Sequence, residues 1–491
     1  MINWGISANS HNAALAVFDD NKLVFASESE RFSGRKNDPH LNRELILYAR
    51  RFGEPNRVYW YEKPLLKTLR QWSAGQGWNR LENNVEIYLA RHEIDLPISY
   101  TGHHHSHAAA GYYTSKFDAA CVIVIDAIGE FESTSFWAGE GDKLKKINSM
   151  DYPNSVGLFY SAMTQRCGLK PNEEEYILMG MAALGDPNRL VRDMLDDFIE
   201  LPNDDYQHPY RIKQNLHRGC KWWKPELTSQ QDIYDIAAAT QKVYEIVFER
   251  ILQTAIKLSK SRNLVLMGGC ALNCSANPIA YKYFQNVWIM PAPGDSGSSI
   301  GAVLAHTKQH IEWPGACLGY DMGYSRSNEE IVDYLLEHKV CAIARGKAEF
   351  GPRALGNRSI IADPRGPEIK VLINKIKQRE VFRPFAPAIL AEFVNQHFKT
   401  SIESMTYMQF IAPCLEYESF PAVVHYDNTS RVQTVTKEEN PQFRDLLEVW
   451  YKRTGCPMLL NTSLNIKGQA MVNNHADARN WERTYGLPVF N

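Results

Sequence analysis

The chain has 491 residues, of which 44% are hydrophobic and 22% are charged, and its formal net charge is −2 at pH 7. This length predicts two or three domains with sizeable cores, and the nearly balanced charge provides no global field for a polyanion such as nucleic acid. No apolar run approaches the roughly 18 residues of a membrane helix, and no secretion signal is visible, so we expect a cytoplasmic protein. Nine cysteines without a Cys-x-x-Cys pair argue against a disulfide framework and against zinc ribbons.

The first roughly 120 residues alternate short apolar runs with helical stretches, which predicts a mixed α/β fold. A strand predicted at 98–100 is followed by a histidine-rich helix of small residues at 102–113. His103 and His107 are four residues apart, so on a helix both imidazoles lie on one face and can bind one metal ion. A His-x-x-x-His pair alone is more often structural, so further ligands are required.

Two acidic residues qualify as those further ligands. Asp126 follows the apolar run 121–125, at the carboxyl end of a predicted buried strand. Asp295 lies in the Gly/Ser-rich loop 291–301, which opens a helix. Two histidines with one or two carboxylates suit Fe(II), Mn(II) or Zn(II) and leave open positions for a substrate oxygen. We therefore predict a metal site from the two histidines and these acids.

Helices are predicted at 154–184 and 232–258, and a buried strand at 264–267 leads into a glycine loop. Between the helices, a basic segment contains Trp222 and Trp223, a pattern typical of single-stranded nucleic-acid or sugar surfaces. The interpretation that we favour is an exposed hairpin whose tryptophan pair packs onto the protein.

The pattern breaks at 313–316, and the segment 319–323 is short and turn-rich, so we place the domain linker there. A capping box at 327–330 then starts a helix of the second domain. We expect domains at 1–318 and 325–491. No internal repeat is visible.

The second domain concentrates cations. The segment 345–365 holds four arginines and a lysine among three glycines and two prolines, and these cations would repel one another unless anions lay between them. Lys377 and Arg379 follow, and residues two apart on a strand share a face, so both can point at one polyanion. We therefore predict a phosphate site.

These motifs resemble those of known families. A Lys-x-Arg pair with a remote Thr-Ser-x-Asn-x-x-Gly, here at 462–468, resembles YrdC-type domains, which join a carbamoyl-type acid to AMP. The segment 345–365 and the run Arg-Glu-Val-Phe-Arg-Pro-Phe-Ala-Pro at 379–387 closely resemble the signature of the NodU/CmcH family of O-carbamoyltransferases, which includes TobZ. The resemblance implies a C-terminal YrdC-like α/β domain.

The N-terminal part also resembles this family. Matching stretches are 5–15, which contains His11, the Glu-Arg-Phe segment 28–36, and the Gly-Gly-x-Ala-Leu-Asn loop 268–274. The resemblance implies an actin/sugar-kinase-like transferase lobe, with the metal held by the residues aligned with His103, His107, Asp126 and Asp295. Two positions depart from the family pattern. Asn12 replaces an acid but can still accept a hydrogen bond from an imidazole, whereas Ile177 replaces a lysine and cannot supply its charge.

The resemblance implies an ATP-dependent O-carbamoyltransferase. In the second domain, carbamoyl phosphate and ATP, the latter with Mg²⁺, would form carbamoyl-adenylate and release pyrophosphate. In the first domain, Fe(II) or another divalent transition metal would assist transfer to an acceptor hydroxyl, and His11 would act as the base. Predicted catalytic residues are His11, Lys377 and Arg379. Predicted phosphate and nucleotide ligands also include Arg353, Asn357, Arg358, Ser359, Arg383, Ser463 and Asn465. The predicted nucleotide loops of the first domain contain Gly268, Gly269, Asn273, Gly294 and Ser296.

The acceptor stays open: a small-molecule or sugar hydroxyl, or a hydroxymethylated nucleotide or DNA base. A homodimer is compatible with the sequence. The alternatives are tRNA threonylcarbamoyl transfer and a non-catalytic nucleotide-binding module. Related hydrogenase-maturation enzymes have the opposite domain order and Cys-x-x-Cys zinc motifs, which this chain lacks.

Overall fold

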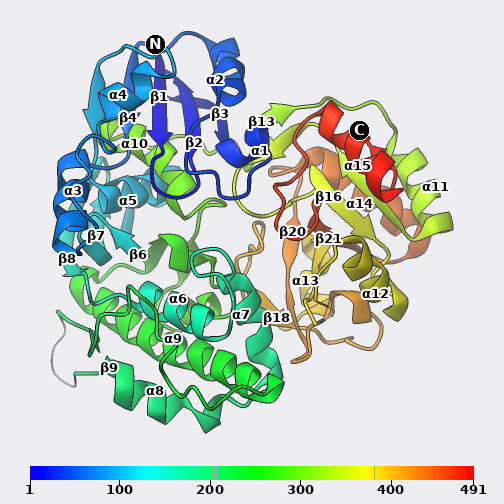
Figure 1. Ribbon diagram of the computed structural model, residues 1–491. Coiled ribbons are helices and arrows are strands. Elements are labelled where there is room, and N and C mark those ends of the chain that lie inside the picture. The colour runs from blue at the N-terminus through cyan, green and yellow to red at the C-terminus, as the bar shows by residue number, and fades with distance from the viewer. Residues whose placement is uncertain (203–206, 381) are drawn as a thin grey trace. The chain divides into compact units, whose positions relative to one another are not determined.

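The computed structural model describes residues 1–202, 207–380 and 382–491, and their contacts divide the chain into two compact units (Figure 1). Unit 1 contains residues 1–25 and 39–313, and unit 2 contains residues 26–38 and 314–491. None of the helices in the described ranges combines the length and the apolar composition needed to span a membrane.

Unit 1 is built on two five-stranded sheets with the same strand order. The first sheet runs β3 (Lys22–Glu28), β2 (Ala14–Asp19), β1 (Ile2–Ser7), β4 (Arg57–Trp60) and β5 (Ile98–Tyr100). The second runs β8 (Lys143–Asp151), β7 (Glu132–Glu140), β6 (Ala119–Gly129), β11 (Asn263–Met267) and β12 (Asn286–Trp288). In the first sheet, the central strand β1 pairs antiparallel with β2 and parallel with β4. In the second sheet, the central strand β6 pairs in the same way, antiparallel with β7 and parallel with β11. The unit therefore contains a structural repeat that was not visible in the sequence.

Two helices of small residues pack between the sheets, namely α5 (His103–Thr114) and α10 (Ser298–Thr307). A Cβ atom on Gly301 of α10 would lie 1.7 Å from the carbonyl oxygen of Ser106 in α5, so the two helices touch backbone to backbone. A Cβ atom on Gly5 of β1 would lie 1.8 Å from the carbonyl oxygen of Ser299. These close approaches, which only glycine allows, fix α10 against the first sheet and α5 against α10, while α5 itself packs on the second sheet.

Helices cover the remainder of unit 1. They are α2 (Arg43–Ala49), α3 (Pro64–Ser73), α4 (Val85–Ala90), α6 (Val156–Arg166), α7 (Glu175–Met181), α8 (Val191–Phe198) and α9 (Gln230–Ser259). The long helix α9 starts at a capping box of Ser229 and Asp232 and packs against α6, α7 and α8 (Figure 1). The helix predicted at 232–258 and the strand at 264–267 are confirmed, whereas the segment 154–184, predicted to be largely helical, forms two helices, α6 and α7, with residues 167–174 between them.

The two tryptophans of the basic segment have different surroundings. Trp223 is 3% exposed and Trp222 is 57% exposed, and both rings contact Phe198. Trp223 also donates from Nε1 to Asp197 over 2.8 Å. The predicted packing of this pair is therefore confirmed for Trp223, whereas Trp222 offers much of its ring to solvent.

Unit 2 contains a six-stranded sheet. Its order is β20 (Gln433–Val435), β17 (Ala386–Leu390), β21 (Met458–Ser463), β16 (Arg358–Ala362), β14 (Val340–Ala344) and β22 (Val489–Phe490). Its helices include α1 (Ser29–Ser33), α11 (Asn328–His338), α12 (Pro367–Ile376), α13 (Val394–His397), α14 (Pro441–Thr454) and α15 (His475–Tyr485). Leu335 of α11 and Trp450 of α14 are buried with Ile361 of β16 in one core. The mixed α/β fold predicted for the chain is thus confirmed in both units, and α11 starts at the predicted capping box.

Two segments near the unit boundary differ from expectation. The turn-rich linker predicted at 319–323 is wrong for its first part, because Cys317–Asp321 forms β13 and pairs with β15 (Lys347–Glu349). Gly319 permits this pairing, since a Cβ atom there would already lie 3.1 Å from Ala348. Near the N-terminus, residues 26–38 group with unit 2, where the Glu28 carboxylate accepts a hydrogen bond from the amide of Gly351.

Candidate functional site

Helix α5 presents two buried imidazoles on one face, as predicted. His103 and His107 are 2% and 0% exposed, and their Nε2 atoms lie 3.2 Å apart. The three alanines at 108–110 and Gly111 are also buried, which lets the helix lie close to α10 and to the second sheet. The nitrogen atoms are thereby held in the interior of unit 1, out of contact with bulk water.

Asp126 lies where β6 departs from regular pairing with β7, between Ile125 and Gly129. Its Oδ1 accepts hydrogen bonds from the amides of Ala127 at 2.8 Å and Gly269 at 3.4 Å. Its Oδ2 is then left to face His103 Nε2 at 3.2 Å. The irregular strand end therefore aims one carboxylate oxygen at the histidines.

Asp295 approaches from the loop that precedes α10. Its Oδ1 lies 3.4 Å from Nε2 of both His103 and His107. The loop is tied to the second sheet because Gly268 donates from its amide to the carbonyl oxygen of Pro293 over 2.9 Å. The same oxygen lies 3.1 Å from His107 Nδ1 and can only accept, so Nδ1 carries the proton and Nε2 presents its lone pair.

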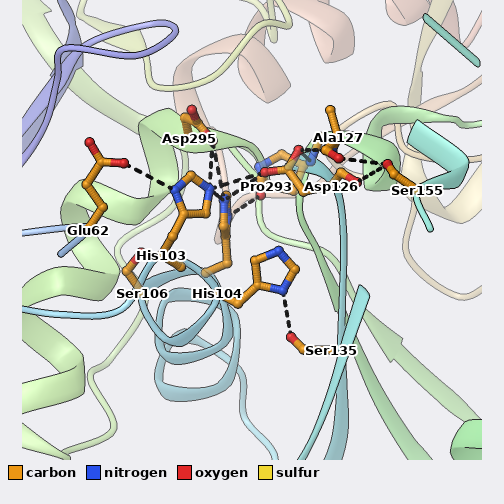
Figure 2. A network of polar contacts seen from close by, with 12 residues as sticks. Glu62, His103, His104, Ser106, Asp126, Ala127, Ser135, Ser155, Pro293 and Asp295 are labelled. Atoms are coloured by element: carbon orange, nitrogen blue, oxygen red, sulfur yellow. Dashed lines mark hydrogen bonds and ion pairs between the residues drawn. The ribbon is translucent and has the colours of Figure 1, made fainter. Parts of the chain in front are cut away.

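These four side chains fit a divalent metal ion. One ligand atom from each of them lies within 4.8 Å of all the others, and Figure 2 shows Asp126 and Asp295 beside His103. Ligand atoms that bind a tetrahedral ion at 2.0–2.1 Å are separated from one another by about 3.4 Å. The five measured separations that involve an imidazole run from 3.2 to 3.5 Å. The donor set and its spacing therefore match those of a transition-metal site.

Opposite charges hold this cluster together. Burial lowers the pKa of His103, but Asp295, Asp126 and Glu62 outweigh burial and keep the pKa well above its ordinary value. Burial raises the pKa of Asp126, yet contact with the two imidazoles brings it well below its ordinary value, and His103 likewise lowers the pKa of Asp295 against burial. Both carboxylates are therefore ionised, which is the state that a cation requires.

Two residues next to the cluster were missed by sequence reasoning. Glu62 Oε2 lies 3.9 Å from His103 Nδ1, on the side of the ring away from Asp126 (Figure 2). Glu62 Oε1 accepts from Lys67 Nζ over 2.6 Å, and Lys67 also donates to the carbonyl oxygen of Asn9 over 2.7 Å. A signal was present, because Glu62 follows the end of a strand much as Asp126 does.

The departures from the family pattern lie in this unit. His11 is exposed, and Asn12, with a φ of 57°, has a buried Oδ1 without a hydrogen-bond partner. The hydrogen bond expected from the His11 imidazole to Asn12 is therefore not formed in this structure. Ile177 is 1% exposed in α7, where it belongs to the apolar interior.

The predicted nucleotide loops of unit 1 surround the metal ligands. Gly268 has a φ of 89°, and a Cβ atom there would lie 2.2 Å from the carbonyl oxygen of Ile125. Asn273 exchanges side-chain hydrogen bonds with Gln241. Gly294 immediately precedes Asp295, and the carbonyl oxygen of Ser296 accepts from Ser299 Oγ at 2.7 Å. Their role as nucleotide loops stays a prediction.

In unit 2 the structure brings Lys377, Ser463 and Asn465 together. Lys377 is 3% exposed, and its Nζ donates to the carbonyl oxygens of Ser463 and Asn465, the latter at 2.8 Å. It also lies 3.2 Å from Ser463 Oγ and 3.1 Å from Asn465 Oδ1. Burial, Arg379 and Arg383 hold the pKa of Lys377 well below its ordinary value of 10.5.

The strand predicted for Lys377 and Arg379 is wrong. Helix α12 ends at Ile376 and Lys377 caps it in helical conformation, because Ile369 and Ile373 recur at helical spacing and are buried. Arg379 consequently lies apart from the Lys377 hydrogen bonds. It donates from Nε to Asn374 Oδ1 over 2.7 Å, and its guanidinium lies 4.2 Å from the centroid of the Phe385 ring.

Several of the remaining predicted phosphate ligands form hydrogen bonds with nearby backbone atoms. Arg358 is fully buried and donates to the carbonyl oxygens of Tyr320, Arg345, Gly346, Asn357 and Asn473. Asn357 donates from Nδ2 to the Lys347 carbonyl, and Ser359 Oγ accepts from the amide of Gly356. Arg353 is half-buried, and Arg383 Nη1 lies 3.7 Å from Glu380. Their contact with phosphate stays a prediction.

Comparisons with known proteins identify the family of both parts of the chain. Residues 60–304 match the family described as "Carbamoyltransferase N-terminus", and residues 332–489 match "Carbamoyltransferase C-terminus". Nodulation protein U of Rhizobium tropici is 33% identical, covering 96% of this chain and 92% of that protein. The 3'-hydroxymethylcephem-O-carbamoyltransferase of Amycolatopsis lactamdurans is 27% identical, covering 95% of this chain and 94% of that protein.

Among solved structures, HypF in a phosphate- and nucleotide-bound form is similar with a TM-score of 0.37 and 12% identity. That match covers 62% of this chain and 46% of HypF, and it is too weak to support any statement about function. The sequence matches are much stronger, because they extend over nearly the whole chain and include both carbamoyltransferase parts. The chain therefore belongs to the NodU/CmcH family of carbamoyltransferase enzymes.

Proposed function

We propose that this chain is an ATP-dependent O-carbamoyltransferase that performs one step in each unit. The observation that carries the proposal is that each unit gathers its own predicted set of side chains. Unit 1 gathers two imidazoles and two carboxylates, and unit 2 gathers Lys377 with Ser463 and Asn465. Family membership supports carbamoyl transfer as the overall reaction.

In unit 2, carbamoyl phosphate would react with water to give carbamate and phosphate, and carbamate would attack the α-phosphorus of Mg²⁺-bound ATP. A C–O–P link forms, the bond between the α- and β-phosphates breaks, and pyrophosphate leaves with carbamoyl-adenylate as the other product. Lys377 would supply positive charge for the phosphate oxygens. Ser463 and Asn465, both bonded to its ammonium group, would hold that group in place.

In unit 1, the carbamoyl group would pass to an acceptor hydroxyl, with AMP leaving. A divalent transition metal such as Fe(II), held by His103, His107, Asp126 and Asp295, would supply a Lewis acid for the carbamoyl oxygen. His11 would take the proton from the acceptor hydroxyl as the new C–O bond forms. Exposure of His11 supports this role, because a base must reach a substrate that enters from solvent.

The acceptor is proposed to be a primary alcohol. One relative is named for transfer to a 3'-hydroxymethylcephem, in which a hydroxymethyl group is the acceptor. Hydroxymethyl groups also occur on sugars and on modified nucleotides or DNA bases, so these belong to the acceptor panel. The test incubates the protein with ATP, Mg²⁺, carbamoyl phosphate and each candidate, and follows replacement of H by CONH₂ by mass spectrometry. Product that forms without ATP would contradict the adenylate route.

A further inference from the structure

We propose that the buried Glu62–Lys67 ion pair is a positioning unit that orients the ligand His103 and fixes the segment carrying His11. This inference rests on the proposed function for the roles of His103 and His11. Neither Glu62 nor Lys67 contacts the reacting groups, so both would act through the residues that they hold.

The first half of the unit is the contact between Glu62 and His103. His103 turns Nε2 toward His107 and the carboxylates, and its Nδ1 is buried without a hydrogen-bond partner. Glu62 Oε2 faces that Nδ1 across 3.9 Å. A carboxylate behind a ligating imidazole keeps the proton on Nδ1 and the lone pair on Nε2.

The second half consists of the hydrogen bonds that Lys67 makes to two different segments. Its Nζ donates to Glu62 Oε1 over 2.6 Å and to the carbonyl oxygen of Asn9 over 2.7 Å. Asn9 has a φ of 64°, and its amide donates to the Pro39 carbonyl over 2.8 Å. The backbone two residues before His11 is thereby pinned at both of its polar groups.

Stability alone is a weak explanation for this ion pair. Glu62 and Lys67 are each 4% exposed, and the loss of hydration on burying two charges offsets most of their attraction. Two apolar side chains of similar volume would fill the same space without that loss. The pair lies between His103 and the segment that carries His11. Positioning of these two residues therefore explains the buried charges better than packing does.

The test uses Co²⁺ alone as the probe, because its visible absorption reports both binding and ligand geometry. Glu62→Gln keeps an oxygen for Lys67 but offers an N–H to His103 Nδ1, where an acceptor is needed. We expect the Co²⁺ dissociation constant to rise by about 10- to 100-fold, with a changed absorption spectrum. Wild-type affinity in Glu62→Gln would overturn the inference.

The matched control is Glu130→Gln. Glu130 is a buried acid that accepts from the backbone amide of Lys63 and, at the start of α5, from the backbone amide of His103, so both of these hydrogen bonds go to backbone and not to the His103 ring. Its neutralisation removes the same charge from the same neighbourhood, so Co²⁺ affinity should change little. An equal loss of Co²⁺ affinity in both variants would show that the effect comes from removing a negative charge near the site, and it would overturn the proposed contact between Glu62 and His103. If Glu62→Gln does not fold, Glu62→Asp replaces it, and shortening the side chain should weaken Co²⁺ binding in the same direction.

The role of Lys67 is tested with Lys67→Met and the conservative Lys67→Arg. Lys67→Met should lower kcat for carbamoyl transfer while carbamoyl phosphate-dependent ATP–pyrophosphate exchange, assigned to unit 2, continues at the wild-type rate. Lys67→Arg should restore part of kcat because it keeps a donor for both oxygens. Unchanged kcat in Lys67→Met would overturn this half. Since the Co²⁺ titration needs no substrate, a protein that binds Co²⁺ but transfers no carbamoyl group would count against the proposed function and not against the Glu62 contact.

Discussion

His107 donates from Nδ1 to the carbonyl oxygen of Pro293 over 3.1 Å, although 186 residues separate them in the chain. The bond joins α5 to the loop that carries Asp295, so two proposed metal ligands from distant segments are positioned by one contact. It also fixes the proton on Nδ1 and turns the Nε2 lone pair toward the other ligands. The site thus depends on the sheet-and-helix frame of unit 1 as much as on the ligands themselves.

Removing one ligand should empty the metal site. The purified protein is expected to carry a stoichiometric divalent metal, and His107→Ala should lose most of it, because the remaining donors leave the ion undercoordinated. Elemental analysis of both proteins measures this. The control is His105→Gln on the same helix, whose imidazole stacks on Trp137 and takes no part in the cluster. Equal metal content in wild type and His107→Ala would remove the site from the account.

The crossing of α5 and α10 should be intolerant of any side chain. In Gly301→Ala the new Cβ atom would lie 1.7 Å from the Ser106 carbonyl oxygen, so the helices must separate. We expect a loss of about 1–3 kcal/mol in the free energy of unfolding, measured with urea, together with weaker metal binding. Gly294→Ala is the control for stability, because the nearest atom to its Cβ would be 3.9 Å away. Full stability of Gly301→Ala would show that the helices are not in close contact.

The pKa of Lys377 predicts opposite effects of pH on activity and stability. Burial, Arg379 and Arg383 lower this pKa well below 10.5, so the cation is lost earlier than usual as pH rises. ATP–pyrophosphate exchange should therefore fall on the alkaline side with a pKa below 10.5. Folding stability should gain over the same window, because only the unfolded chain still binds the proton there.

Lys377→Met should lack both of these pH effects. Lys375→Met serves as the control, since Lys375 is exposed on the same helix and should leave both profiles unchanged. If the ATP–pyrophosphate exchange that remains in Lys377→Met still falls at alkaline pH, a group other than Lys377 causes the pH dependence.

The sequence predicted which four side chains would cluster, because each follows a local rule: two histidines one helical turn apart, one acid at a strand end and one in a glycine loop. Their role as metal ligands stays a prediction. The sequence also predicted that Lys377 would meet Ser463 and Asn465, although only through resemblance. The strand for Lys377 failed because basic residues obscured the helical spacing of Ile369 and Ile373. Arg358 shows a further limit, since nothing local indicates that its guanidinium is enclosed by backbone carbonyls.

The repeat of two sheets in unit 1 could not be predicted for a different reason. The halves share strand order and pairing, which are set by packing between distant segments. Glu62 could have been recognised as an acid at a strand end, but its partner Lys67 depends on how α3 lies against the Asn9 backbone. That relation is tertiary and leaves no pattern in the sequence.

The most direct test of the account measures both half-reactions in two variants. Lys377→Met should lose carbamoyl phosphate-dependent ATP–pyrophosphate exchange, because the cation that holds the phosphates is gone. His11→Ala should keep that exchange and slow transfer to the acceptor by about 10²–10⁴-fold, as expected for loss of a general base. If His11→Ala loses exchange as severely as transfer, the two steps are not divided between the units and the account is contradicted.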